Sequence, residues 1–156
     1  MSINHLITPS RTYCWSNTSS KKRTLEKISQ VVSSSQANLS EEHIFNILID
    51  RERLGSTGIG KGIAIPHGRI KNLEKPIACL IKLNTPIDFD AIDNQPVDIL
   101  FTLLVPEESD QEHLDLLAEL ASLLSQNDFC THLRNTTSSE ELFSVFTDWA
   151  DNKVPA

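Results

Sequence analysis

Glycine is scarce in this chain of 156 residues, and all five glycines lie in one segment, Gly55 to Gly68, which reads GSTGIGKGIAIPHG. Outside this segment the chain has no residue that can take positive φ angles without steric cost. The concentration of glycine marks the segment as a specialised loop. Two interpretations are open at this point: a loop that holds a nucleotide phosphate, or a loop that presents His67 to another molecule.

Paired cysteines and long apolar runs are also missing. Cys14, Cys79 and Cys130 are far apart in the chain, so we interpret them as small buried residues in a reducing compartment. The longest apolar run, residues 99–105, is too short to cross a bilayer. The first fifteen residues lack the basic start and apolar stretch of a secretion signal. We therefore expect a cytoplasmic protein without membrane insertion.

Positive charge is sparse and unevenly placed. The net charge is −7, whereas nonspecific nucleic-acid binding requires a basic surface, so we expect no nucleic-acid partner. Basic residues recur through 51–82, but none occurs between Lys82 and Arg134. This distribution fits either two ordinary solvated faces or a cationic patch around the glycine segment that favours an anion.

The length and the apolar patterns predict one domain over residues 1–156, with an irregular or partly extended lead at 1–18 and a tail at 151–156. Apolar spacing and capping residues predict helices at 19–35, 40–54, 109–124, 128–134 and 138–150. Runs rich in β-branched residues predict strands at 77–83 and 97–105, the second of them central. We therefore expect an α/β fold: a single-domain sandwich with a mixed β-sheet flanked by α-helices on both faces.

Local signals set the expected helix ends. Ser40 is the predicted N-cap of the second helix, which carries Leu54 on its apolar face and ends at Gly55. Two capping boxes, each a serine followed three residues later by a glutamate, open the later helices: Ser109 with Glu112, and Ser138 with Glu141.

The nucleotide interpretation fails on both residues and context. Gly55, Gly60 and Lys61 nearly match the phosphate-loop pattern, but Gly62 stands where a hydroxyl would bind magnesium. Such a loop leaves a strand and opens a helix. Here a helix ends at Gly55, and the following IAIPHG is typical of a short strand that ends at Pro66. The remaining interpretation makes His67 the functional residue at the end of that strand.

The chemistry of His67 suits phosphoryl transfer. Neutral imidazole, with a pKa of about 6.5, can attack phosphorus at cellular pH. The product adds roughly 1.5 to 2 negative charges, for which Ser56, Thr57 and the glycine-rich backbone offer donors. A guanidinium suits this spread charge, and Arg51 and Arg53 precede the loop. The alternative is a partly buried histidine with a structural role.

A second histidine, His113, lies in the first turn of the predicted helix 109–124. It either continues the apolar stripe of that helix or donates a hydrogen bond to a phosphoryl group, aided by the helix dipole. A metal site at His67 and His113 lacks the spacing of known ligand motifs, so we expect no metal and no cofactor. The other three histidines are predicted to be surface or structural residues: His5, His43 and His132.

Two stretches are similar to a known family. DRERLGSTGIGKGIAIPHGRI at 50–70 resembles the phosphorylation-site segment of the IIA proteins of the bacterial phosphoenolpyruvate phosphotransferase system, mannitol/fructose type. TPIDFDAIDNQPVDILFTLLVPEESDQEHLDLLAELASLL at 85–124 resembles the second half of that family, and specifically its nitrogen-regulatory branch. The similarity runs from about residue 21 to 149.

The resemblance implies the mannitol-type IIA fold and a set of site residues. It implies that His67 is phosphorylated on Nε2, as a tele-phosphohistidine, by the phosphohistidine of a small HPr-like carrier. Arg51, rather than Arg53, takes the place of the family's active-site arginine, and His113 that of its second active-site histidine. We expect backbone amides and hydroxyls near Ser56 and Thr57 to complete the phosphate cradle.

Several functions stay open on the sequence. The first is a regulatory phosphocarrier, a phosphotransferase component that acts mainly as a regulator, in which the state of His67 decides which target docks. The resemblance to the nitrogen-regulatory branch implies a nitrogen- and potassium-linked role, with a transporter or a sensor kinase as the expected kind of target. The second is a sugar-specific IIA subunit that passes phosphate to a IIB cysteine. The third is a binding module that is never phosphorylated, and the fourth is a nucleotidase.

Overall fold

The computed structural model describes residues 3–16 and 18–153, with the side chains of 152 and 153 left out. Its elements, in chain order, are two short 3-10 helices, η1 (Ile3–His5) and η2 (Pro9–Arg11), then β1 (Thr12–Trp15), α1 (Lys21–Ser35), α2 (Glu41–Arg53), β2 (Gly58–Gly60), β3 (Ile63–Ala64), β4 (His67–Ile70), β5 (Ile77–Ile87), β6 (Val97–Pro106), α3 (Gln111–Leu124), α4 (Asn127–Arg134) and α5 (Ser139–Lys153). No helix in the described ranges is long and apolar enough to span a membrane.

The strands form one mixed sheet. Its order is β1-β5-β6-β3-β2, and β4 also pairs with β6. β5 and β6 are antiparallel neighbours, whereas β1 runs parallel to β5, and β3 and β4 run parallel to β6. The prediction that 97–105 is a central strand is confirmed, since β6 has neighbours on both sides and is buried along almost its whole length.

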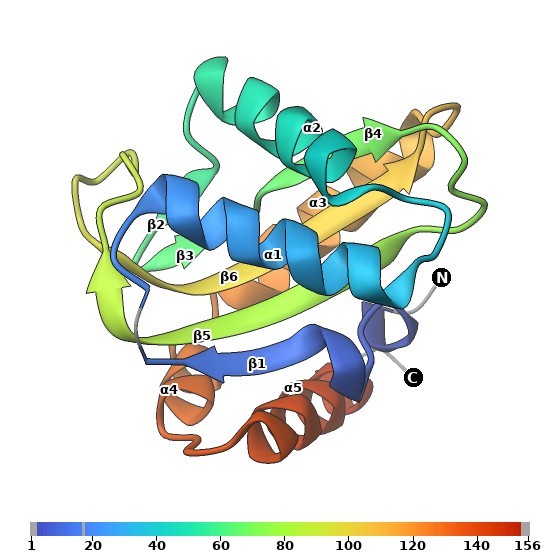
Figure 1. The fold of residues 1–156 in the computed structure, drawn as a ribbon. Coiled ribbons are helices and arrows are strands. Elements are labelled where there is room, and N and C mark those ends of the chain that lie inside the picture. The colour runs from blue at the N-terminus through green and yellow to red at the C-terminus, as the bar shows by residue number, and fades with distance from the viewer. Residues whose placement is uncertain (1–2, 17, 154–156) are drawn as a thin grey trace.

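Helices cover both faces of the sheet, as predicted (Figure 1). Along β5 and β6, side chains alternate between the two faces, as the pleat requires. One set packs with α1 and α2, and the other packs with α3, α4 and α5. The result is a single α/β sandwich with an apolar core on each side of the sheet.

The N-terminal lead contributes to this sheet. We expected an irregular or partly extended segment at 1–18, and Thr12–Trp15 forms the edge strand β1 beside β5. At the other end, α5 extends to Lys153 and so includes the first residues of the expected tail, while residues 154–156 lie outside the described residues.

The path from β3 to β4 differs from the prediction of one strand that ends at Pro66. β3 stops at Ala64, and the chain resumes pairing with β6 at His67, which is therefore the first residue of β4. Pro66 has no N–H to donate, so the ladder is interrupted there. Its carbonyl still accepts a hydrogen bond from Leu103 N at 2.9 Å, which keeps the chain beside β6.

Two predicted helix starts are confirmed, and a third is wrong. Ser40 accepts from His43 N, and Ser138 accepts from Glu141 N, each at 3.1 Å. The Ser109 cap does not form: α3 begins one residue later, with Asp110 as N-cap and no side-chain cap bond in the described structure. The Asp110 carboxylate pairs with Arg69 of β4 at 3.1 Å.

Leu54 was also misplaced by the sequence pattern. α2 ends at Arg53, and Leu54 is the C-cap residue with 85% of its surface exposed. The predicted stop at Gly55 is confirmed, since Gly55 directly follows the C-cap residue. Leu54 therefore faces solvent next to the glycine segment rather than the core.

Candidate functional site

His67 opens β4 and is held by a backbone contact. Its Nδ1 lies 2.7 Å from the carbonyl oxygen of Ile65. A carbonyl only accepts hydrogen bonds, so Nδ1 carries the proton and Nε2 carries the lone pair. The ring is partly buried, with Nε2 on the side of Arg51.

Arg51 reaches this nitrogen from the last turn of α2. Its Nε donates to Nε2 of His67 at 3.3 Å, and its Nη1 donates to the carbonyl oxygen of Gly55 at 2.8 Å. The contact requires α2 to pack closely on β4. Gly68 permits this, because a Cβ at that position would lie 2.4 Å from Cγ2 of Ile47 on α2.

His113 comes to the same place from the first turn of α3. Its ring centroid lies 5.4 Å from that of His67, with the rings edge to face. Only 7% of the residue is exposed, and neither ring nitrogen has a hydrogen-bond partner within the described part of the chain. A buried imidazole without a partner costs free energy, which suits a group reserved for a ligand.

A pocket of about 220 Å³ lies at this junction. Apolar side chains from β2, from the link between β3 and β4 and from α3 complete its walls, and His113 is not among the lining residues. The lining residues are Arg51, Ser56, Thr57, Ile59, Ile65, His67, Leu117 and Ala121. Arg53 is not among them: it is exposed and pairs with Asp50 at 3.0 Å. Of the two arginines, Arg51 is the one that faces the pocket.

Ser56 and Thr57 line the pocket, but their hydroxyl protons are engaged. Ser56 Oγ donates to the carbonyl oxygen of Phe89 at 2.6 Å and accepts from Gly58 N at 3.0 Å. Thr57 Oγ1 donates to the carboxylate of Glu52. In this arrangement the two hydroxyls shape the glycine segment, and they reach a phosphoryl group only if these bonds rearrange.

Glu52 and Lys21 are site-supporting residues that the sequence analysis missed. Glu52 is 6% exposed and accepts from Thr57 N at 3.0 Å, and Lys21 Nζ lies 3.0 Å from its Oε1. The sequence did contain a pattern that indicates the burial of Glu52. Ile44, Leu48 and Glu52 follow one another at spacings of four, so the glutamate stands on the buried stripe of its helix.

The surroundings of His67 and His113 lower the pKa of both side chains and so favour their neutral forms. Burial is the main cause that lowers the pKa of His67, and the charge of Arg51 adds to it, against the bond to Ile65 and the charge of Glu52. Burial also lowers the pKa of His113, with further contributions from His67 and Arg69. Neutral imidazole is the form that attacks phosphorus or donates through a single N–H.

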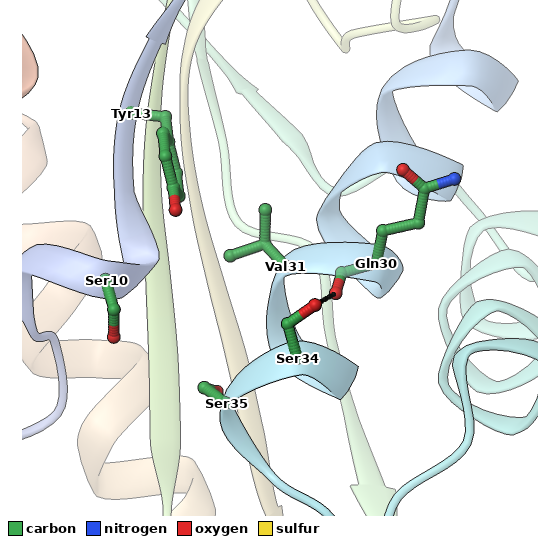
Figure 2. Close-up of a pocket in the computed structure, with 6 residues that line it drawn as sticks. All are labelled: Ser10, Tyr13, Gln30, Val31, Ser34 and Ser35. Atoms are coloured by element: carbon green, nitrogen blue, oxygen red, sulfur yellow. Dashed lines mark hydrogen bonds between the residues drawn. The ribbon is translucent and has the colours of Figure 1, made fainter.

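A second pocket, of about 290 Å³, lies between α1 and the lead segment and is lined by Ser10, Tyr13, Gln30, Val31, Ser34 and Ser35 (Figure 2). Ser34 Oγ donates to the Gln30 carbonyl and Ser35 Oγ to the Val32 carbonyl, each at 2.9 Å. These lining residues present no charged group to a phosphoryl ligand.

Comparison with known proteins identifies the family of this chain. Residues 6–149 match the family model described as phosphoenolpyruvate-dependent sugar phosphotransferase system, EIIA 2. A nitrogen regulatory protein of Pseudomonas aeruginosa is 42% identical over 146 residues, which cover 94% of this chain and 95% of that protein. The crystal structure of the nitrogen regulatory protein IIA-Ntr from Neisseria meningitidis superposes with a TM-score of 0.84 at 36% identity, covering 92% of this chain and 97% of that one.

A more distant structure shares the fold. The IIA mannitol protein of Escherichia coli superposes with a TM-score of 0.73 at 18% identity, covering 89% of this chain and 97% of that chain. At this identity the likeness extends to architecture alone. The family match over residues 6–149 and the nitrogen regulatory relatives show that this chain belongs to the EIIA 2 family of the phosphotransferase system, in its nitrogen-regulatory branch.

Proposed function

We propose that the chain is a cytoplasmic regulatory phosphocarrier that accepts a phosphoryl group on Nε2 of His67 from the phosphohistidine of an HPr-like carrier. The state of His67 then decides which regulatory target docks, with a transporter or a sensor kinase as the expected kind of target. The observation that carries this proposal is the pairing of Nδ1 with the Ile65 carbonyl, which leaves Nε2 unprotonated beside a guanidinium.

The transfer step follows from this geometry. Nε2 supplies the electron pair of the new N–P bond, and the pair of the broken N–P bond stays on the donor imidazole. The Nδ1–H remains hydrogen-bonded to Ile65 and stabilises the positive charge that the His67 ring acquires. No proton has to leave His67 for the bond to form, so catalysis is a matter of positioning and charge.

Arg51 and His113 stabilise the transferring group in this proposal. Phosphorus must approach the side of Nε2 that Arg51 Nε now occupies, and the displaced guanidinium then donates to the phosphoryl oxygens. His113 has buried, unpaired ring nitrogens beside His67, and its single N–H supplies a further donor. We also propose that the backbone around Ser56 and Thr57 completes the cradle.

The surface around the pocket suits a protein donor better than a small one. Ile59 lines the pocket and is 43% exposed, while Leu54 and Leu114 are exposed next to Gly55 and His113 in the chain. Exposed apolar side chains beside a site are typical of protein contacts. The relatives from Pseudomonas aeruginosa and Escherichia coli, at 42% and 44% identity, are named nitrogen regulatory proteins, which favours a regulatory over a sugar-transport role.

The experiment is intact-protein mass spectrometry after incubation with phosphoenolpyruvate, the first enzyme of the system and an HPr-like carrier. We expect one acid-labile phosphoryl group on the wild type and none on His67→Ala, with both proteins folded. A phosphoryl group on His67→Ala would show that the acceptor is another residue. An unlabelled wild type would leave the binding-module function in its place, and onward transfer to a IIB cysteine would identify a sugar-specific subunit.

A further inference from the structure

A buried carboxylate lies directly beside the site arginine. The side chain of Glu52 is 2% exposed, and the residue follows Arg51 in the last turn of α2. An ionised carboxylate in this environment needs partners that offset its lost hydration. The partners of the Glu52 carboxylate show which parts of the molecule it connects.

Each contact of Glu52 ties a different part of the molecule to α2. Thr57 donates twice, from its backbone N at 3.0 Å and from its hydroxyl. Lys21, the first residue of α1, places Nζ 3.0 Å from Oε1. The same Nζ lies 3.4 Å from the carbonyl oxygen of Phe89 and 4.6 Å from the centre of its ring. Glu52 therefore joins α1, α2 and the start of the glycine segment.

These contacts continue to His67 through the turn at residues 55–57. Thr57 is held by Glu52, and Gly55, two residues earlier, accepts from Arg51 Nη1 at 2.8 Å. Arg51 in turn donates through Nε to His67. If the Glu52 carboxylate releases Thr57, the turn keeps its backbone bonds, from Gly55 N to the Glu52 carbonyl and from Ile65 N to the Thr57 carbonyl, but the Gly55 carbonyl that holds the guanidinium is fixed less tightly.

We propose that Glu52, with Lys21 as its counter-ion, is a positioning residue: it holds the turn at 55–57 so that Arg51, bonded to Gly55, stays beside His67 within reach of the phosphoryl oxygens. This inference rests on the proposed phosphocarrier function. Glu52 does not touch the phosphoryl group in this scheme. It acts through Thr57, Gly55 and Arg51, and its effect is on the rate of transfer rather than on docking of the donor.

Glu52→Gln is the first test. The amide keeps the shape but removes the charge facing Lys21 and turns one acceptor into a donor facing Thr57. We expect the phosphorylation rate at saturating carrier to fall by at least about tenfold, while the half-saturating carrier concentration changes less than about twofold. Glu42→Gln, the same change at an exposed position of α2, is the matched control and should transfer at the wild-type rate.

A second pair of variants keeps the test decisive if Glu52→Gln does not fold. Lys21→Met removes the counter-ion and should slow transfer, whereas Lys21→Arg keeps the positive charge and should restore most of the rate. A folded Glu52→Gln or Lys21→Met protein that is phosphorylated at the wild-type rate overturns the proposal.

A measurement on unphosphorylated protein separates this inference from the proposed function. By NMR, the Arg51 Nε–H should be protected from exchange with water in the wild type, and should exchange severalfold faster in Glu52→Gln. If the wild type accepts no phosphoryl group, the proposed function fails, and this exchange rate still decides the positioning role. Equal Arg51 protection in the two proteins overturns it.

Discussion

Nε of Arg51 donates a hydrogen bond to Nε2 of His67, with 3.3 Å between the two nitrogens, although sixteen positions separate the two residues in the chain. One belongs to the last turn of α2 and the other opens β4, so the contact exists only because the helix packs on the strand. The nitrogen that accepts this bond is also the proposed nucleophile. In the proposed transfer, Arg51 therefore leaves Nε2 as phosphorus approaches and donates to the phosphoryl oxygens from the same side.

Loss of this guanidinium should slow transfer strongly. We expect Arg51→Ala to reduce the single-turnover phosphorylation rate by about 100- to 1,000-fold, the range for losing one donor that stabilises transition-state charge. Arg51→Lys should recover only part of the rate, because an ammonium cannot bond Gly55 and the phosphoryl group in the same fork geometry.

Arg53→Ala is the control for charge alone, since Arg53 is exposed and pairs with Asp50. Its rate should stay within about twofold of the wild type. If Arg53→Ala slowed transfer as much as Arg51→Ala, the effect would come from general positive charge on this surface and not from the contact with His67.

His113→Ala should slow transfer without abolishing acceptance. One neutral donor to the phosphoryl oxygens is worth about 1 kcal/mol, which corresponds to roughly a fivefold loss in rate. Rapid quench with labelled carrier measures this loss. A wild-type rate in the variant would assign His113 a packing role in α3 only.

The rate should depend on pH through His67. Burial lowers the pKa of His67, and only the neutral ring has a lone pair on Nε2. The rate should therefore be constant above about pH 6.5, the ordinary value for histidine, and fall as the pH drops through the lower, folded value. A midpoint above pH 6.5 would contradict the burial seen here.

The same shift affects stability with a defined sign. Because the folded pKa values of His67 and His113 are lowered, the unfolded chain binds more protons between those values and about 6.5. The free energy of unfolding should rise with pH across that window and lose this contribution as the pH falls. Urea unfolding of the double variant His67→Ala, His113→Ala should show a smaller loss on acidification than the wild type.

Gly68 should tolerate no side chain while Ile47 is present. In Gly68→Ala the new Cβ would lie 2.4 Å from Cγ2 of Ile47, so we expect a loss of about 1–3 kcal/mol in the free energy of unfolding. Ile47→Ala removes that methyl group, and the two changes together should cost less than their sum. If the losses in free energy of unfolding of the two single variants simply added in the double variant, the contact between the new Cβ and Ile47 would not be the cause of the loss in Gly68→Ala.

Much of the fold follows from local patterns. The stripe of α1, the serine caps at Ser40 and Ser138 and the apolar run of β6 are each determined within a few residues, and the structure contains all of them. Ser109 does not cap α3, and the Asp110 carboxylate at the N-cap pairs with Arg69, a residue forty-one positions away. Sequence spacing carries no information about such a partner.

The functional site likewise has features that local sequence predicts and features that depend on tertiary packing. Neighbouring residues in the chain were enough to argue against a nucleotide loop and to predict His67 as the chemically distinctive residue of the glycine segment. The tautomer of His67, the approach of Arg51 and His113, and the burial of Glu52 come from tertiary packing alone. Those properties depend on how α2 and α3 pack against β4 and β6, and packing joins residues through space that the chain keeps far apart.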